Sequence, residues 1–401
     1  MARNLVLCAD GTCNAFAHAS NVARLVRHVA LGPAQVACYD QGIGTRNRER
    51  RAVEAFRDGL DHPEGLEILP PPSDRLARPW TWASLLAAVT RGKGLEENVA
   101  QLYGALARRY AAGDRVFLFG FSRGAFTVRA LAGLVWRHGL PETGDPGAIA
   151  ARFAAAWPRF AAEYGRPGGA DDPEAGRPCP IHFMGLWDTV KSYGGLTPVL
   201  LPHLRHNPCV ATVRHAMALD ERRGWFEVTT WGWLDADRRD GAAASRLPRD
   251  VAARLGDRDV AEVWFTGAHA DVGGGAGNAA TSDVALRWML GEAAAAGLTL
   301  NADGWVLLAR PDAAPVPSDP RSLFWRLVDA KARRRIDNGG VWPRSVPGVR
   351  GPSPRQPFAA ARDGTVWIHE SVRGAERLGR PPVGVALRVR RTRRAGSAPT
   401  S

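Results

Sequence analysis

The sequence predicts an α/β fold in which a doubly wound, mostly parallel sheet carries helices on both faces. Short apolar runs alternate along the chain with longer segments whose apolar residues recur at helical spacing. The runs lack the polar alternation of half-exposed strands, and uninterrupted apolar strands are typical of parallel sheets covered on both faces. At 401 residues, the chain has room for one such sheet with loop and helical insertions.

In the first third of the chain, strand and helix signals follow one another closely. The apolar run Asn4–Ala9 ends in Asp-Gly-Thr, which is typical of a strand that meets a turn. Ser20 and Asn21 then precede apolar residues at helical spacing, as an N-cap does. Further on, the pattern predicts a strand at 36–39, an excursion from the core at about 46–92, helices at 94–110 and 125–136, and a strand at 115–119.

The alternation continues through the middle of the chain and weakens beyond residue 300. The pattern predicts helices at 149–157, 210–219 and 281–292, and strands at 181–186, 227–231 and 262–265. Beyond residue 300, Pro, Gly and Arg are mixed without a clear period, and one further helix is expected at 321–335.

A glycine-rich turn lies between a predicted strand and a predicted helix. Its sequence, Gly120-Phe121-Ser122-Arg123-Gly124, matches Gly-x-Ser-x-Gly. Small residues must flank the serine because the turn is tight, and the turn lifts the serine Oγ above the carboxyl edge of the sheet. The helix N-terminus behind it favours developing negative charge. The pattern is typical of an α/β hydrolase with Ser122 as nucleophile, and the alternative is a turn in which Ser122 only caps the helix.

A nucleophilic serine needs a histidine as its base and a carboxylate to orient that base. In α/β hydrolases these residues follow in the chain order Ser, acid, His. Asp188 comes directly after the apolar run that ends at Trp187, and His269 lies in a glycine-rich segment after another apolar run. The sequence therefore predicts a triad of Ser122, Asp188 and His269. Taken singly, Asp188 also fits a helix cap and His269 an ordinary loop histidine.

Several blocks in the same chain order resemble a known family. They are Asp10-Gly-Thr-x-Asn14, Tyr39-Asp40-x-Gly42-x-Gly44-Thr45, Gly120–Phe126, Gly185–Val190 and Trp264–Gly275, together with His215–Arg222 and His369–Val372. They are similar to the catalytic domain of the type VI secretion phospholipase effectors of the first class, an α/β-hydrolase family formerly described as a domain of unknown function. The resemblance implies an enzyme that cleaves acyl esters, phospholipid above all, and supports the same three residues. Cys13 and Ala276 stand where the family often has aromatic residues.

The oxyanion of an ester hydrolase needs backbone N–H donors. We expect one from Arg123, the residue after the nucleophile, and a second from Gly11 or Thr12 in the loop after the first strand. Asp10, Asp40 and Asp271 are expected in loops that support the site, although Asp10 also fits a simple turn cap. The same acids and Asp188 could instead bind a hard metal ion, but no ligand spacing typical of a metal loop is present, and no metal or other cofactor is predicted.

Positive charge is concentrated near the C-terminus. The chain has 53 basic and 40 acidic residues, and residues 331–401 hold 16 of the basic and 4 of the acidic ones. This part of the chain fits a solvated extension, a surface that docks on anionic lipid or, with its aromatic residues far apart, less readily a nucleic-acid site. We expect a catalytic domain at 1–300 with an insertion at about 46–92, a basic extension at 301–390 partly packed on it, and a disordered tail at 391–401.

The five cysteines are scattered and include no Cys-x-x-Cys pair, which argues against a disulfide framework or a zinc site. The first apolar run stops at Asp10, too early for a signal peptide, and no apolar stretch approaches the ~18 residues of a membrane span. We therefore expect a cytoplasmic protein. The resemblance adds export by a type VI secretion system, with a secretion-system or immunity partner.

Together these observations predict a serine hydrolase that cleaves carboxylic acyl esters, a phospholipase or lipase, through a Ser-His-Asp triad and an acyl-enzyme. Its substrate would be a phospholipid or another acyl ester, with peripheral contact to anionic membrane and without nucleic acid. The alternative is a non-catalytic binding module that docks on acidic lipid or nucleic acid through the Arg-rich C-terminal region.

Overall fold

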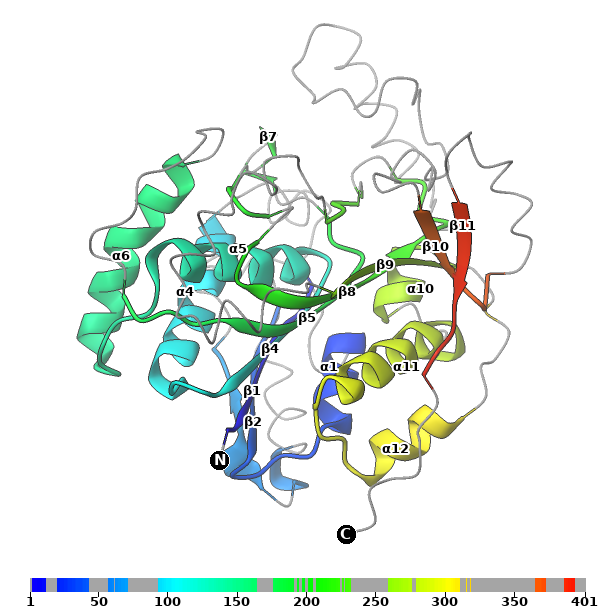
Figure 1. Cartoon of the computed structure of the whole chain (residues 1–401), viewed down its shortest axis with the longest axis horizontal. Helices are drawn as coiled ribbons and strands as arrows, with labels where there is room; N and C mark the ends of the chain where they lie inside the picture. The colour runs from blue at the N-terminus through cyan, green and yellow to red at the C-terminus, as the bar shows by residue number, and fades with distance from the viewer. Residues whose placement is uncertain are drawn as a thin grey trace, which may run out of the picture.

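The computed structural model describes residues 2–11, 20–42, 57–60, 62–70, 93–163, 176–190, 193–194, 197–198, 201–204, 207–223, 226, 228–231, 259–275, 279–310, 315, 318, 365–372 and 386–393 (Figure 1). Within these residues, one sheet has the strand order β11-β10-β9-β8-β5-β4-β1-β2-β3, and all neighbouring strands run parallel. The strands are β1 (Asn4–Ala9), β2 (Gln35–Asp40), β3 (Leu66–Ile68), β4 (Arg115–Phe121), β5 (Ile181–Trp187), β8 (Val210–Ala218), β9 (Asp259–Phe265), β10 (Thr365–His369) and β11 (Ala386–Arg390). A small antiparallel pair, β6 (Tyr193–Gly194) and β7 (Thr197–Pro198), lies outside this sheet.

Helices cover both faces of the sheet (Figure 1). On one face lie α4 (Lys93–Arg109), α5 (Arg123–His138) and α6 (Pro146–Ala162), and on the other lie α1 (Asn21–His28), α11 (Ala279–Ala295) and α12 (Ala302–Ala309). Two short helices, η3 (Pro63–Gly65) and α10 (His269–Gly273), lie in connections. The doubly wound α/β fold predicted from the sequence is thus confirmed. Among the described helices, none is both long and apolar enough to span a bilayer.

Local sequence explains where several helices begin. The Oγ of Ser20 accepts the N–H of Ala23 at 3.1 Å and so caps α1. The carboxylate of Asp145 caps α6 in the same way, by accepting the N–H of Ala148 at 2.8 Å. Such caps satisfy N–H groups that have no partner within the helix, and they stabilise it by about 1 kcal/mol each.

The order of the strands creates a topological switch point at the carboxyl edge of the sheet. From β1 the chain passes outward to β2 and β3, and it then returns through α4 to β4 on the opposite side of β1. The loops after β1 and β4 therefore lead away from each other. Open α/β sheets bind their ligands at the position between two such loops. Ser122 follows β4 and Asp10 follows β1, so both lie at this point.

Two sequence predictions of local structure are wrong. Residues 210–219 were expected to be helical, but they form the central strand β8. Arg214 and His215 interrupt its apolar pattern, yet both are buried, because they pair with Glu292 and Glu262. The strand predicted at 227–231 is reduced to a bridge between Val228 and Val190.

Other sequence predictions fall partly outside the described residues. The helix expected at 321–335 lies wholly outside them. The described part of the excursion at 46–92 contains η3 and also β3, which forms one edge of the sheet. The division into domains remains a prediction.

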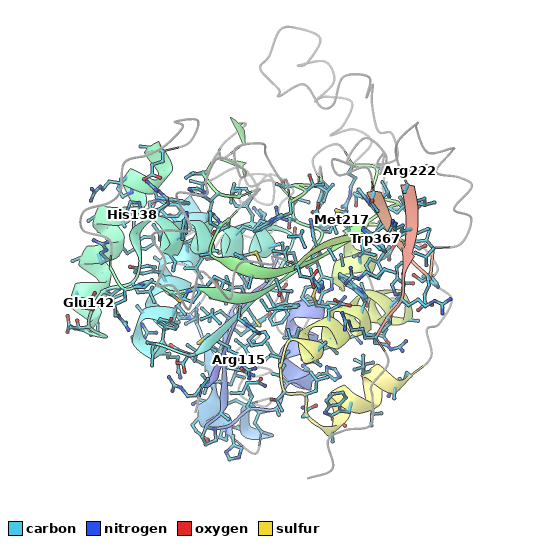
Figure 2. All side chains as sticks on the ribbon, viewed as in Figure 1. Arg115, His138, Glu142, Met217, Arg222 and Trp367 are labelled. Carbon is cyan, nitrogen blue, oxygen red and sulfur yellow. The ribbon has the colours of Figure 1, made fainter. Side chains whose placement is uncertain are left out.

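The C-terminal region contributes two strands to the sheet. Met217 of β8, Trp264 of β9 and Ile368 of β10 belong to one small apolar cluster, and Figure 2 labels Met217 there. Beyond β11, the side chain of Thr392 contacts Nε2 of His369 at 3.0 Å. Residues 391–393 follow the end of β11, and of these the side chain of Thr392 is buried. Residues 394–401 lie outside the described residues, so the disordered tail expected at 391–401 stays a prediction.

Candidate active site

Ser122 lies on a strained turn between β4 and α5. Its backbone has φ 57° and ψ −120°, a conformation that residues other than glycine rarely adopt. Gly124 passes so close to β1 that a Cβ there would lie 2.5 Å from the carbonyl carbon of Ala9 and 2.6 Å from the carbonyl oxygen of Asp10. The glycine of the motif is therefore needed for the close packing of α5 on the end of β1.

The structure brings together the three residues singled out from the sequence. Nε2 of His269 lies 2.8 Å from Oγ of Ser122, and Nδ1 of His269 lies 2.6 Å from Oδ2 of Asp188. Because a carboxylate can only accept, Nδ1 carries the proton and Nε2 is the acceptor for the serine hydroxyl. All three side chains are buried, and Ser122 is 8% exposed.

Asp188 is held by backbone groups at the end of β5. Its Oδ1 accepts the N–H of Ala218 at 2.9 Å, which leaves Oδ2 for the imidazole of His269. The next residue, Thr189, donates its N–H to Nε2 of His215 at 3.1 Å, so Nδ1 of His215 is the donor to Glu262 at 2.8 Å. The buried His215 thus supports the turn that carries Asp188.

His269 begins the short helix α10 rather than lying in a flexible loop. Its ring packs against Phe121 and Phe226, with ring centroids 4.6 Å and 4.9 Å away. Burial lowers the pKa of His269, and the opposing effect of Asp188 does not outweigh it. Gly273, at the end of α10, is packed so closely that a Cβ there would overlap the ring of Phe121.

The expected oxyanion donors differ in what they contact. Arg123 is the first residue of α5, so its N–H belongs to the helix N-terminus beside Ser122. The N–H of Gly11, however, donates to Oδ1 of Asp10 at 2.7 Å. Thr12 lies outside the described residues.

Of the remaining acids, Asp10 and Asp40 lie near each other at the ends of the neighbouring strands β1 and β2, and Asp271 lies on α10. Asp10 accepts hydrogen bonds from Tyr39 Oη at 2.6 Å and from Ser20 Oγ. Asp40 is fully buried, and within the part of the chain that the structure describes neither of its oxygens has a hydrogen-bond partner. Burial and the nearby Asp10 raise its pKa well above the ordinary value. Asp271 accepts the N–H of Ala268 at 2.9 Å and the side chain of Ser318 at 2.8 Å. Among the described residues, no three His, Cys, Asp or Glu side chains are grouped as metal ligands would be.

Comparison with protein-family models identifies the family of this chain. Residues 3–292 match the model of the T6SS phospholipase effector Tle1-like catalytic domain. The chain belongs to this family. The Tle1-like family is one of phospholipase effectors, which supports a lipase-like enzyme.

Two individual proteins are also similar to this Tle1-like chain. The uncharacterized protein YEL023C of Saccharomyces cerevisiae is 29% identical over 243 residues, which cover 56% of this chain and 32% of the yeast protein. A crystal structure of an uncharacterized protein from Pseudomonas aeruginosa is 19% identical, covers 86% of this chain and 55% of that one, and has a TM-score of 0.39, too low to bear on fold or function. The chain thus spans about a third of the curated relative and about half of the solved structure.

Several residues around the site were not singled out from the sequence. Phe121 and Phe226 flank the ring of His269, and Glu221 accepts its backbone N–H at 3.2 Å. Glu221 lies within the block His215–Arg222, which the family resemblance marked without giving it a role. That block was the available signal, but no spacing within it points to His269.

Proposed function

We propose that this protein is a serine hydrolase that cleaves carboxylic acyl esters, with phospholipid as its substrate, through an acyl-enzyme on Ser122. The observation that supports this most is the continuous chain of hydrogen bonds from Ser122, on its strained turn, through His269 to Asp188. A nucleophile, a base and a group that orients the base are the parts that such catalysis requires. Membership of a phospholipase effector family favours a lipid substrate.

In the proposed reaction, Ser122 Oγ attacks the ester carbonyl while His269 Nε2 takes its proton. Asp188 keeps the proton of His269 on Nδ1 and stabilises the imidazolium that forms. The N–H of Arg123 and the N-terminus of α5 face the negative charge that develops on the carbonyl oxygen. His269 then gives its proton to the leaving alcohol oxygen, and the acyl group remains on Ser122. Water, deprotonated by His269, attacks this acyl ester and releases the fatty acid.

The place of action is part of the same proposal. A phospholipase effector acts on membrane lipid, so we infer export by a type VI secretion system and a peripheral contact with anionic membrane. An immunity protein that protects the producing cell would be the matching partner.

The test compares the purified wild-type chain with Ser122→Ala on a p-nitrophenyl ester and on phospholipid vesicles. Loss of the nucleophile should lower kcat/KM by at least about 10³-fold on both substrates. Ser371→Ala is a matched control, because Ser371 is also a buried serine 2.9 Å from a histidine, His369, but that histidine contacts Thr392 instead of a carboxylate. A chelator should leave the rate unchanged. Equal activity of Ser122→Ala and wild type would refute the proposal.

A further inference from the structure

A buried carboxylate lies directly behind the start of α10. Glu221 follows β8 and is 1% exposed. Its Oε2 accepts the backbone N–H of His269 at 3.2 Å, and its Oε1 accepts those of Arg222 and Arg223 at 3.0 Å and 2.8 Å. A buried carboxylate that accepts this many hydrogen bonds is held firmly in place, and removing it would leave several backbone N–H groups without an acceptor.

The neighbouring Asp220 holds the preceding turn. Its backbone N–H donates to the carbonyl of Gly267 at 2.9 Å, and its carboxylate accepts the N–H of Gly267 at 2.7 Å. The consecutive pair Asp220 and Glu221 therefore fixes the backbone on both sides of Ala268. This backbone places the imidazole of His269.

Glu221 also reaches the ring of His269 through side chains. The guanidinium of Arg223 makes two hydrogen bonds to the Glu221 carboxylate, from Nε at 2.9 Å and from Nη2 at 2.8 Å. The same guanidinium lies 3.7 Å over the ring of Phe226, which packs edge-on against the ring of His269. Glu221 thus supports His269 through the backbone and through a stack of Arg223 on Phe226.

We propose that Glu221 is a positioning residue for His269, which holds the imidazole at the place where it bridges Ser122 and Asp188. This role rests on the proposed function, in which His269 is the base. Asp188 holds Nδ1 of the ring from the end of β5. From the end of β8, Glu221 holds the backbone of His269 and, through Arg223, the Phe226 ring that packs edge-on against the imidazole.

The charges around His269 give this role a measurable signature. Arg223 lowers the pKa of His269, whereas Glu221 raises it, so removing either charge should shift that pKa in the opposite direction from the other. Among the described residues, charged groups near the start of α10 are Asp188 after β5, Asp220, Glu221 and Arg223 after β8, and Asp271 on α10 itself.

The experiment uses two variants of the full-length chain. Glu221→Gln keeps an oxygen that can accept the N–H of His269 but removes the charge. Arg223→Gln replaces a side chain that is 13% exposed and therefore tolerates substitution more readily. On a soluble ester, Glu221→Gln should lower kcat by about 10- to 100-fold with little change in KM, because a small displacement of the base is costly. The acid limb of kcat/KM should move to lower pH in Glu221→Gln and to higher pH in Arg223→Gln. Glu163→Gln breaks a pair of the same type, Arg137 with Glu163 at 2.7 Å, away from the site, and should change neither.

Titration of the His269 imidazole by NMR, assigned by the signal missing in His269→Gln, reports the same shifts without turnover. Thermal unfolding of each variant shows that it is folded. Unchanged titration of His269 in both variants, or shifts in the same direction, would overturn the role of Glu221. Full activity of Ser122→Ala would instead refute the proposed function, and the titration would still decide whether Glu221 positions His269.

Discussion

Replacing Gly124 by alanine should remove most of the activity even though no reacting group changes. The new methyl would lie 2.5 Å from the carbonyl carbon of Ala9 and 2.6 Å from the carbonyl oxygen of Asp10, where ordinary contact begins at 3.4 Å. The obstacle is the backbone at the end of β1, an interior strand of the sheet that cannot readily give way, so α5 must move away by about 1 Å. Ser122 directly precedes α5 and would move with it.

A displacement of about 1 Å at a reacting atom costs about 10²-fold in rate, and overpacking of this kind costs about 1–3 kcal/mol of stability. The expected result for Gly124→Ala is therefore a kcat about 100-fold lower and a lower Tm. Helix propensity alone would predict the opposite change in Tm, since alanine in place of glycine stabilises a helix by up to about 1 kcal/mol when space allows.

The assay measures kcat/KM on a soluble ester and Tm on the same samples. Gly144→Ala is the control, because a Cβ there would lie 3.8 Å from the nearest atom, at Arg108, so its activity should match the wild type. Activity of Gly124→Ala within about twofold of wild type, at unchanged Tm, would show that the turn is not held by close packing on β1.

Three further outcomes are expected. Burial lowers the pKa of His269, so the base stays neutral to lower pH and kcat/KM should reach half its plateau below the ordinary value of ~6.5; a midpoint above pH 7 would contradict this. Burial raises the pKa of Asp40, so the folded state holds this proton more tightly than the unfolded chain and loses stability as pH rises above ~3.9. Asp40→Asn should therefore raise Tm at pH 7–8 and leave it unchanged near pH 3.5. A lower Tm of Asp40→Asn at neutral pH would show that the Asp40 charge is compensated. Burial alone would raise the pKa of Glu292, but the nearby Arg214 and Arg390 outweigh burial and lower that pKa. Glu292→Gln should therefore reduce the free energy of unfolding by about 3 kcal/mol and speed hydrogen exchange in 386–393. Unchanged exchange in 386–393 would show that Glu292 does not hold this segment.

Much of the fold and of the site is predictable because the signals are local. The strand before Ser122 and the helix after it are apolar, and the glycines between them are required by the tight turn. Asp188 and His269 each follow a buried strand, and parallel strands bring their carboxyl ends to one edge. Chain order and strand ends are therefore enough to bring the three residues together.

The remaining features depend on contacts between distant parts of the chain. The pattern at 210–219 predicts a helix, whereas these residues form strand β8. Arg214 and His215 can be buried in this strand because Glu292 and Glu262 pair with them from other elements. Likewise, the sequence around Asp220 and Glu221 does not indicate that these residues hold the turn before His269. Glu221 and His269 are 48 residues apart in the chain. Pairing partners at such distances leave no periodic pattern in the sequence.

The late position of β10 in the chain has a consequence for synthesis on the ribosome. Val263 of β9 pairs with Trp367 of β10, so more than 100 residues must be added before the outer edge of β9 finds its partner. At 5–20 residues per second, this takes roughly 5–20 s. During that time the strand that leads to His269 presents unpaired backbone groups, which invite pairing with other chains. A nascent chain, or a fragment that ends near residue 292 and still contains Ser122, Asp188 and His269, should therefore depend on a chaperone to avoid aggregation.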